Sequence, residues 1–399
     1  MPDGDPRRAA GSGRTIAGAV AVSASGSLAV FLVGSLAIQI RGSLRFGPAS
    51  LGIAISVYYA GAALGSVPFG RLAEAIGGAR AMRAAAGAGT AVLLLLAVAA
   101  HSFDVLAALL FAAGLVSSAI QPATNLFLAR RTPPDRQGLA FGIKQAAVPT
   151  SALLAGLAVP AIALTVGWRW AFVGAAAVAA AAALSVPRPR TSLADRRGAP
   201  RPTARPGSLA PLAVLAAGFG LGVFTATGLS AFTVSSAVAA GLAPGTAGLL
   251  AALGGALSVG ARVTSGARAD RRGRAHLPVV SVMLAAGAAG YVAIAAGAAQ
   301  HDAALLVAGV AVAYGAGWGW NGLFNFAIVR THSEAPARAT AITQVGGRLA
   351  GAVGPLSFGL IATHASYATA WVVNAGAAVA AAAVILAGRR MLVASRRVA

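Results

Sequence analysis

Long apolar runs are the feature of this sequence that most constrains its fold. A helix needs about 20 apolar residues to cross roughly 30 Å of hydrocarbon, and runs near this length follow one another along the chain of 399 residues. Only 10% of the residues are charged, against about a quarter in soluble domains, which argues against a water-soluble protein. We therefore predict an all-α membrane protein with twelve transmembrane helices, near residues 15–40, 48–70, 81–101, 104–128, 139–165, 169–187, 208–235, 245–266, 277–299, 303–328, 339–363 and 367–388.

The distribution of basic residues predicts how the chain is oriented. Loops on the cytoplasmic side of a membrane carry an excess of Lys and Arg. If the N-terminus is cytoplasmic, 25 of the 31 basic residues lie in cytoplasmic segments, and only Arg41, Arg45 and Arg169 lie on the opposite side. We expect a multi-pass protein of the cytoplasmic (inner) membrane with both termini cytoplasmic. The net charge of +22 could also suggest a nucleic-acid binder, but apolar runs separate the Arg clusters, so we expect no nucleic acid as a partner.

The chain lacks the residue combinations that an enzyme would need. It has no Cys, which excludes disulfides, thiolate metal sites and Cys nucleophiles. The predicted spans contain no catalytic acid pair, no cluster of metal ligands and no pairing of a nucleophile with a base. We therefore expect no enzymatic activity, no cofactor and no metal. The first apolar run has no small-residue cleavage signature, which favours a retained helix over a signal peptide.

A polar stretch rich in Pro and Arg divides the chain in two. Its composition excludes a membrane helix and indicates an extended cytoplasmic linker. The expected organisation is an N-terminal tail at 1–14, a six-helix bundle at 15–187, the linker at 188–207, a second six-helix bundle at 208–388 and a C-terminal tail at 389–399.

The two halves resemble each other in sequence. At an offset of 199 residues, Arg131 matches Arg330 and Gln145 matches Gln344. Similar segments at the same place in each half indicate an internal duplication. Parallel halves of this kind form transporters with a site between them.

A motif containing Gly and charged residues follows the predicted second and eighth spans. The residues of the complete later copy are Gly266, Asp270, Arg271, Gly273 and Arg274, and those of the incomplete earlier copy are Gly70, Glu74 and Gly77. The motif resembles the signature loop of the major facilitator superfamily, and the twelve spans, the central linker and the cytoplasmic termini are similar to that family too. The resemblance covers nearly the whole chain and implies a fold of two pseudo-symmetric six-helix bundles.

The resemblance also implies that the motif acts as a gate. A carboxylate at a helix end can approach the positive N-terminus of a neighbouring helix and hydrogen-bond nearby Arg. In the family arrangement Asp270 would face the start of span five near Gly138, and Glu74 would face the start of span eleven. Arg262 lies eight residues before Asp270 on roughly the same helix face, so it is a candidate structural member of the gate. The alternative, that these residues only set the topology, stays open.

Two basic residues inside predicted spans are candidates for substrate binding. An ionisable group in a span costs about 2.5–3.5 kcal/mol on insertion scales and is a functional candidate by default. Arg348 lies about nine residues into span eleven, roughly 13 Å deep at 1.5 Å per residue. Lys144, the only lysine, lies about five residues into span five. It either lines the mouth of a cavity or extends its ammonium to the lipid headgroups.

The acidic residues bear on what is transported. All nine carboxylates lie away from the middle of the predicted spans. Proton-coupled transporters that resemble this family carry an Asp or Glu in the membrane as the proton carrier, and this sequence has none. Cations without an internal counter-ion suggest that the substrate supplies the negative charge, and Arg suits a carboxylate or a similar planar anion.

Polar and aromatic residues on the remaining spans complete the candidate site. By resemblance, spans one, four, seven and ten line the central path. Gln121 and Asn125 are four residues apart and share a helix face, as do Asn321 and Asn325. Trp318 lies inside span ten rather than at its edge. The competing role for the Asn and Gln pairs is hydrogen bonding between helices.

These observations predict a secondary active transporter that works by alternating access. We expect its substrate to be a small organic anion, and the alternative is export of a drug or an amphipathic metabolite. The expected partners are a small-molecule substrate and membrane lipid, a co-transported ion is left open, and the chain is expected to act as a monomer.

Overall fold

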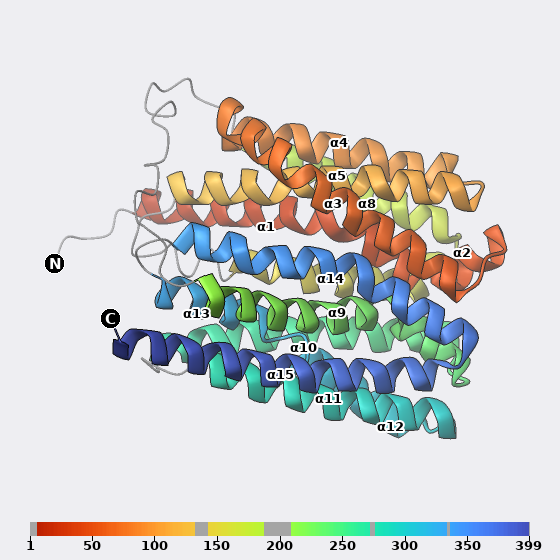
Figure 1. The fold of residues 1–399 in the computed structure, drawn as a ribbon. Coiled ribbons are helices and arrows are strands. Elements are labelled where there is room, and N and C mark those ends of the chain that lie inside the picture. Colours follow the sequence, from red (N-terminus) through yellow and green to blue (C-terminus); the bar gives the residue numbers. More distant parts are fainter. Residues whose placement is uncertain (1–5, 132–142, 187–208, 272–275, 333–335, 399) are drawn as a thin grey trace.

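The computed structural model describes residues 6–131, 143–186, 209–271, 276–332 and 336–398. Every regular element in these ranges is a helix, and the long helices run side by side in one elongated bundle (Figure 1). Eleven of the helices are long and apolar enough to cross a membrane. The expectation of an all-α membrane protein is therefore confirmed for the described part of the chain.

The helices follow the predicted spans closely. Those of the first half are α1 (Pro6–Ser35), α2 (Ala37–Leu44), α3 (Pro48–Ile76), α4 (Gly78–Ala99), α5 (Phe103–Arg131), α7 (Ala147–Ala158), the π-helix η2 (Val159–Ala163) and α8 (Trp168–Ser185). Those of the second half are α9 (Leu209–Ala239), α10 (Pro244–Arg271), α11 (His276–Gln300), α12 (Ala303–Gly315), α13 (Asn321–Thr331), α14 (Pro336–His364) and α15 (Tyr367–Val398).

The structure describes helical residues in both predicted tails but does not describe the predicted linker. Helix α1 begins within the predicted N-terminal tail, and α15 extends to Val398, through the predicted C-terminal tail. The predicted linker at 188–207 lies outside the described residues.

One predicted span is interrupted. The continuous helix expected over 303–328 is instead the pair α12 and α13, joined by a turn at 316–320. Side chains satisfy backbone oxygens within this turn, since Trp320 Nε1 donates to the Gly317 oxygen at 2.8 Å and Arg262 donates to the Trp318 oxygen at 3.3 Å. These backbone carbonyl oxygens, which would accept hydrogen bonds from N–H groups in a continuous helix, therefore accept them from side chains instead. Neither short helix is long enough alone to count as a span, which leaves eleven candidate spans, rather than twelve, in the described ranges.

The fifth span also departs from regular α-helix. Pro160 has no N–H to donate and its ring crowds the preceding turn, and here the helix widens into η2, with the Leu164 N–H bonded to the Val159 oxygen at 3.1 Å. A short turn at 164–167 joins η2 to α8. It ends at Gly167, whose φ of 102° is a conformation that favours glycine.

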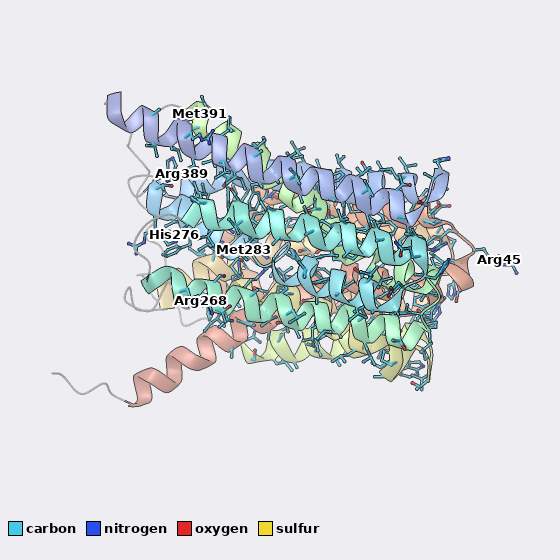
Figure 2. The ribbon with its side chains drawn as sticks, turned by 90° about the horizontal axis from the view of Figure 1, so that it is seen from below. Arg45, Arg268, His276, Met283, Arg389 and Met391 are labelled. Carbon is cyan, nitrogen blue, oxygen red and sulfur yellow. The ribbon has the colours of Figure 1, made fainter. Side chains whose placement is uncertain are left out.

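The ends of the bundle differ in charge and packing. We call the end where α1 begins and α15 finishes the termini end, and the opposite end the far end (Figure 1). Arg268 and Arg389 lie at the termini end, whereas Arg45 lies at the far end (Figure 2).

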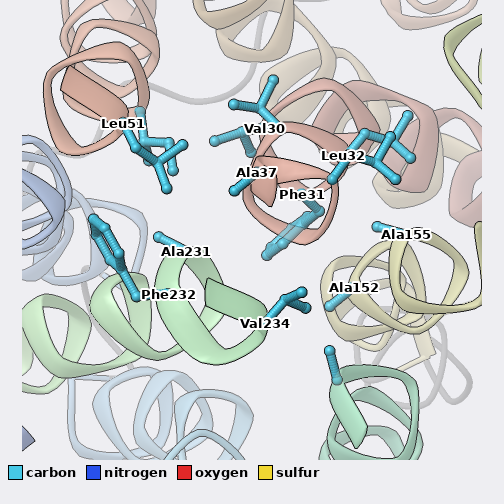
Figure 3. Close-up of a cluster of buried hydrophobic side chains, with 14 of the residues drawn as sticks. Val30, Phe31, Leu32, Ala37, Leu51, Ala152, Ala155, Ala231, Phe232 and Val234 are labelled. Carbon is cyan, nitrogen blue, oxygen red and sulfur yellow. The ribbon is translucent and has the colours of Figure 1, made fainter. Parts of the chain in front are cut away.

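Among the described residues, the apolar cluster that joins the halves extends from the far end toward the middle of the bundle. A single cluster of buried side chains there combines both halves, and in Figure 3 Phe31 of α1 points toward α9, which carries Ala231 and Val234. Two further clusters lie toward the termini end. One contains only residues of the first half, such as Met82, and the other contains only residues of the second half. The halves therefore share a core at the far end and have separate cores at the termini end.

Close backbone contact reinforces this far-end junction. Helix α3 packs on α14, α7 on α10 and α1 on α9. At Gly52 of α3, an added Cβ would lie 2.4 Å from the backbone oxygen of Pro355 in α14. Small residues allow membrane helices to approach this closely.

Candidate functional site

A buried ammonium forms the centre of the candidate site in the first half. Lys144, just before α7, is only 3% exposed. Its Nζ donates a hydrogen bond to Oε1 of Gln121 and another, of 2.8 Å, to Oδ1 of Asn125. The shared face predicted for these two α5 residues is therefore observed. The ammonium reaches across to α5 rather than toward the bundle end, so the extended position considered for Lys144 is not adopted.

Two helices that flank α1 are thus joined by the Lys144 side chain. Both α5 and α7 pack on α1, and a second polar contact lies deeper on the same side, where Ser151 of α7 donates to the Ala24 oxygen of α1 at 2.8 Å. Both hydrogen-bond partners of the ammonium are neutral amides.

An equivalent cluster lies in the second half. Asn325 Nδ2 donates to Asn321 Oδ1 at 3.2 Å, so the shared face predicted for this pair is observed too. Gln344 of α14 donates in turn to Asn325 Oδ1 at 3.2 Å. Both clusters therefore have two amide side chains, four residues apart, and a donor from the helix that follows.

The internal duplication accounts for this likeness. At an offset of 200 residues, Gln121 corresponds to Asn321, Asn125 to Asn325 and Lys144 to Gln344, and the bond from each donor to the nearer amide spans 19 residues in both halves. This offset differs by one residue from the one found by sequence. Gln344 was not among the predicted site residues, because the offset of 199 pairs it with Gln145 rather than with Lys144. The two halves therefore differ at this point by one charge.

Arg262 links the halves near the termini end. Its guanidinium, 8% exposed, donates from Nη1 to the backbone oxygen of Gln145 in the first half at 2.7 Å and from Nη2 to that of Trp318 in the second at 3.3 Å. Its Cζ also lies 5.5 Å from the centre of the Trp318 ring, within the range of a cation–π contact. The buried Nε has no hydrogen-bond partner among the described residues.

Trp318 lies in the turn between α12 and α13 and is 6% exposed. Its ring centroid is 5.8 Å from that of Phe31 in α1 and 5.5 Å from that of Tyr314. The aromatic group expected inside a helix thus packs at a helix break, against both halves.

Arg348 of α14 stands apart from these clusters. Its side chain is exposed, and no described residue forms a hydrogen bond with it. Gly351 and Pro355, three and seven residues later on the same helix face, pack against Tyr59 and Gly52 of α3. The Arg348 face of α14 is therefore the one turned toward the first half.

The described part of the chain offers these cations no carboxylate within the bundle. Three acidic side chains are described, Glu74, Asp104 and Asp302, and all three are exposed and lie near helix ends. Asp302 caps α12 by accepting from the N–H groups of Ala304 and Leu305.

The predicted gating motif is only partly described. Gly70 lies in α3, the exposed Glu74 lies in its last turn, and Gly77, with φ of 85°, links α3 to α4. No ion pair joins Glu74 to a described residue. Gly266, Asp270 and Arg271 lie in α10, but the side chains of Asp270 and Arg271 are not described. Gly273, Arg274 and the expected partner Gly138 lie outside the described residues.

Comparisons with known proteins agree with this architecture. The family model of the Major Facilitator Superfamily matches residues 18–355. No curated protein matches the sequence.

Among solved structures, the fold is similar to that of a bacterial homologue of the human lysosomal transporter Spinster, in two inward-facing conformations. The occupied form has 16% sequence identity and a TM-score of 0.70, and the unoccupied form has 15% and 0.71. Each match covers 99% of this chain and 98% of the other.

Proposed function

Because the chain belongs to the major facilitator superfamily, we propose that it is a secondary transporter, not an enzyme, that moves a small organic anion across the cytoplasmic membrane by alternating access. One observation carries the choice of an anion. The buried ammonium of Lys144 is bound by two neutral amides and has no carboxylate partner among the described residues. A charge in a membrane span is costly unless it is compensated, and an anionic substrate compensates it.

The packing of the halves supports alternating access. A shared core joins them at the far end, whereas at the termini end each half has its own core. Rocking of one half against the other about a midplane site requires such a junction at one end only. The bonds of Arg262 are the contact to be broken when the termini end opens fully. Glu74, Asp270 and the rest of their motif belong to this gate.

The proposal includes the topology. We assign the broken helix α12–α13 as the tenth of twelve spans, with six in each half. The termini end, with its many Arg residues, is cytoplasmic by the positive-inside rule. The protein works as a monomer, because the proposed site lies between its own two halves.

Binding and transport measurements test the proposal. A ligand that binds the folded state raises its melting temperature in a concentration-dependent way, so the purified protein is screened against carboxylates, other anions and hydrophobic cations. Uptake of the most strongly stabilising anion is then measured in proteoliposomes that contain the protein. We expect Arg348→Gln to weaken its uptake at least about tenfold, equivalent to about 1.4 kcal/mol.

Arg389→Gln is the matched control, since it removes one positive charge from the termini end, outside the site. It should transport as the wild type does. Unchanged anion uptake in Arg348→Gln would refute the role of Arg348.

Export of an apolar or amphipathic compound is the second candidate. The contact of Phe31 with Trp318 across the halves favours it, because aromatic surfaces suit such cargo. Hydrophobic cations would then stabilise the protein where carboxylates do not, and Arg348→Gln would still protect cells from apolar toxins.

A further inference from the structure

Each half of the molecule contributes a cation that neither pairs with a described carboxylate nor bonds across the halves. Lys144 precedes α7 in the first half, and Arg348 lies on α14 in the second. These helices correspond in the duplication, because Lys144 matches Gln344 and Gln344 lies one turn before Arg348. At 1.5 Å per residue, Arg348 is therefore about 6 Å deeper along its helix than the equivalent of Lys144.

Both cations have hydrogen-bonding capacity to spare. An ammonium has three N–H donors, and Lys144 uses two of them on Gln121 and Asn125. The amide of Asn125 is exposed, and its Nδ2 has no acceptor among the described residues. A carboxylate next to Lys144 could accept from both groups. The exposed guanidinium of Arg348 offers the paired donors that bind a second carboxylate in bidentate fashion.

The third cation in the spans is already engaged. Arg262 donates to two backbone oxygens and contacts the Trp318 ring. Its charge holds the halves together, which leaves Lys144 and Arg348 for the substrate.

The balance of charge then decides the substrate class. A monoanion would compensate one of the two cations and leave the other in the membrane with only neutral neighbours, which is unfavourable. An anion with two separated negative groups would compensate both. Because the two cations lie on different halves, such a substrate would also bridge the halves when they close.

We propose that the substrate is a dicarboxylate, with one carboxylate at Lys144, Gln121 and Asn125 and the other at Arg348. This inference rests on the proposed transport of an organic anion and narrows it. The neutral Gln344 and Asn325 then contact the uncharged middle of the substrate.

Matched pairs of ligands test this inference. Binding of malonate, succinate, glutarate and adipate to the purified full-length protein is measured by titration calorimetry, each beside its monomethyl ester. The ester keeps the carbon backbone of its dicarboxylate but carries one negative charge fewer. We expect at least one dicarboxylate to bind about tenfold or more tightly than its ester. Glycerol 3-phosphate, whose negative charge is held on a single group, should bind more weakly than that dicarboxylate.

Variants then locate the second charge. Lys144→Gln gives the first half the side chain that the second half has at Gln344, so the amide cluster can be retained. We expect it to reduce the preference for the dicarboxylate over its ester to less than about twofold, whereas Lys144→Arg keeps most of the preference and Arg389→Gln keeps all of it.

The possible outcomes separate the two proposals. Equal binding of dicarboxylates and esters, or tighter binding of glycerol 3-phosphate, overturns the two-point site and leaves anion transport standing. Binding of hydrophobic cations with no anion bound overturns both. If Lys144→Gln cannot be purified, the wild-type ratio alone still decides.

Discussion

Arg262 and Trp318 contact each other in two ways. The guanidinium donates to the Trp318 backbone oxygen at 3.3 Å, and its Cζ lies 5.5 Å from the centre of the Trp318 ring. Because the same guanidinium also donates to the Gln145 oxygen of the first half at 2.7 Å, one side chain of α10 connects a helix break in its own half to the opposite half. The Arg262 side chain therefore has two roles. It provides a hydrogen-bond donor for a backbone oxygen of the turn, and it joins the two halves near the termini end.

Substitution of Arg262 should loosen the termini end. Arg262→Gln cannot reach both backbone oxygens, and hydrogen bonds to charged groups contribute about 1.5–3 kcal/mol each. Because the protein has no natural Cys, Ser265→Cys one turn along α10 provides a single reactive probe. We expect its alkylation to be about tenfold faster in the Arg262→Gln background. An unchanged rate would show that Arg262 does not hold the halves together.

Gly→Ala substitutions around the break between α12 and α13 should destabilise the protein at some positions and not at others. At Gly317 an added Cβ would lie 2.5 Å from the Ala313 oxygen, and at Gly319 it would lie 2.3 Å from the Gly315 oxygen. Overpacking typically costs about 1–3 kcal/mol, so Gly317→Ala and Gly319→Ala should lower the melting temperature by several degrees.

Gly315→Ala and Gly322→Ala are the matched controls for the break, because no atom lies within 4 Å of a Cβ at either position. Both should melt near the wild-type temperature. Equal destabilisation by all four substitutions would argue against the observed geometry of the turn.

A Cβ at Gly52 should push the halves apart at the far end. The added atom would lie 2.4 Å from the Pro355 oxygen, and a penalty of about 1–3 kcal/mol shifts a two-state equilibrium roughly 5- to 150-fold. Alkylation of Thr363→Cys, whose wild-type hydroxyl accepts from the Ala49 N–H across the same junction at 3.0 Å, should accelerate in Gly52→Ala. Gly376→Ala, which adds its Cβ to open space, should leave the rate unchanged.

The proposed topology can be tested with the same Cys-free background. Thr165→Cys lies in an exposed turn at the far end, and Ser395→Cys lies at the exposed end of α15. In intact cells, a membrane-impermeant maleimide should label position 165 at once and position 395 only after lysis. The reverse pattern would invert the assigned orientation.

Much of the fold could be predicted from the sequence because a span depends on local composition. The lengths of α3, α9 and α11 follow from the requirement for about 20 consecutive apolar residues. The spacing of four residues placed Gln121 beside Asn125 and Asn321 beside Asn325 for a similar reason, since helical periodicity is a local property.

The interrupted tenth span could not be predicted in this way. The hydropathy of residues 303–328 predicts one continuous apolar helix. Whether that helix breaks depends on hydrogen-bond donors for the backbone oxygens of Gly317 and Trp318 that come from outside the regular helical pattern. Those donors are Arg262, 56 residues away, and the Trp320 indole. Only the packed structure brings the first of them to the turn.

The sequence alone thus determined that this is a membrane protein, where its spans approximately lie, that its halves are duplicated and which cations lie inside the spans. Each of these follows from composition or from the spacing of residues along the chain. The tertiary structure decided what those cations meet. It buried Lys144 against two amides, engaged Arg262 with both halves and left Arg348 on the face turned to α3. The physical reason is that the energy of a charge in the membrane depends on neighbours from distant segments, which only the folded chain brings together.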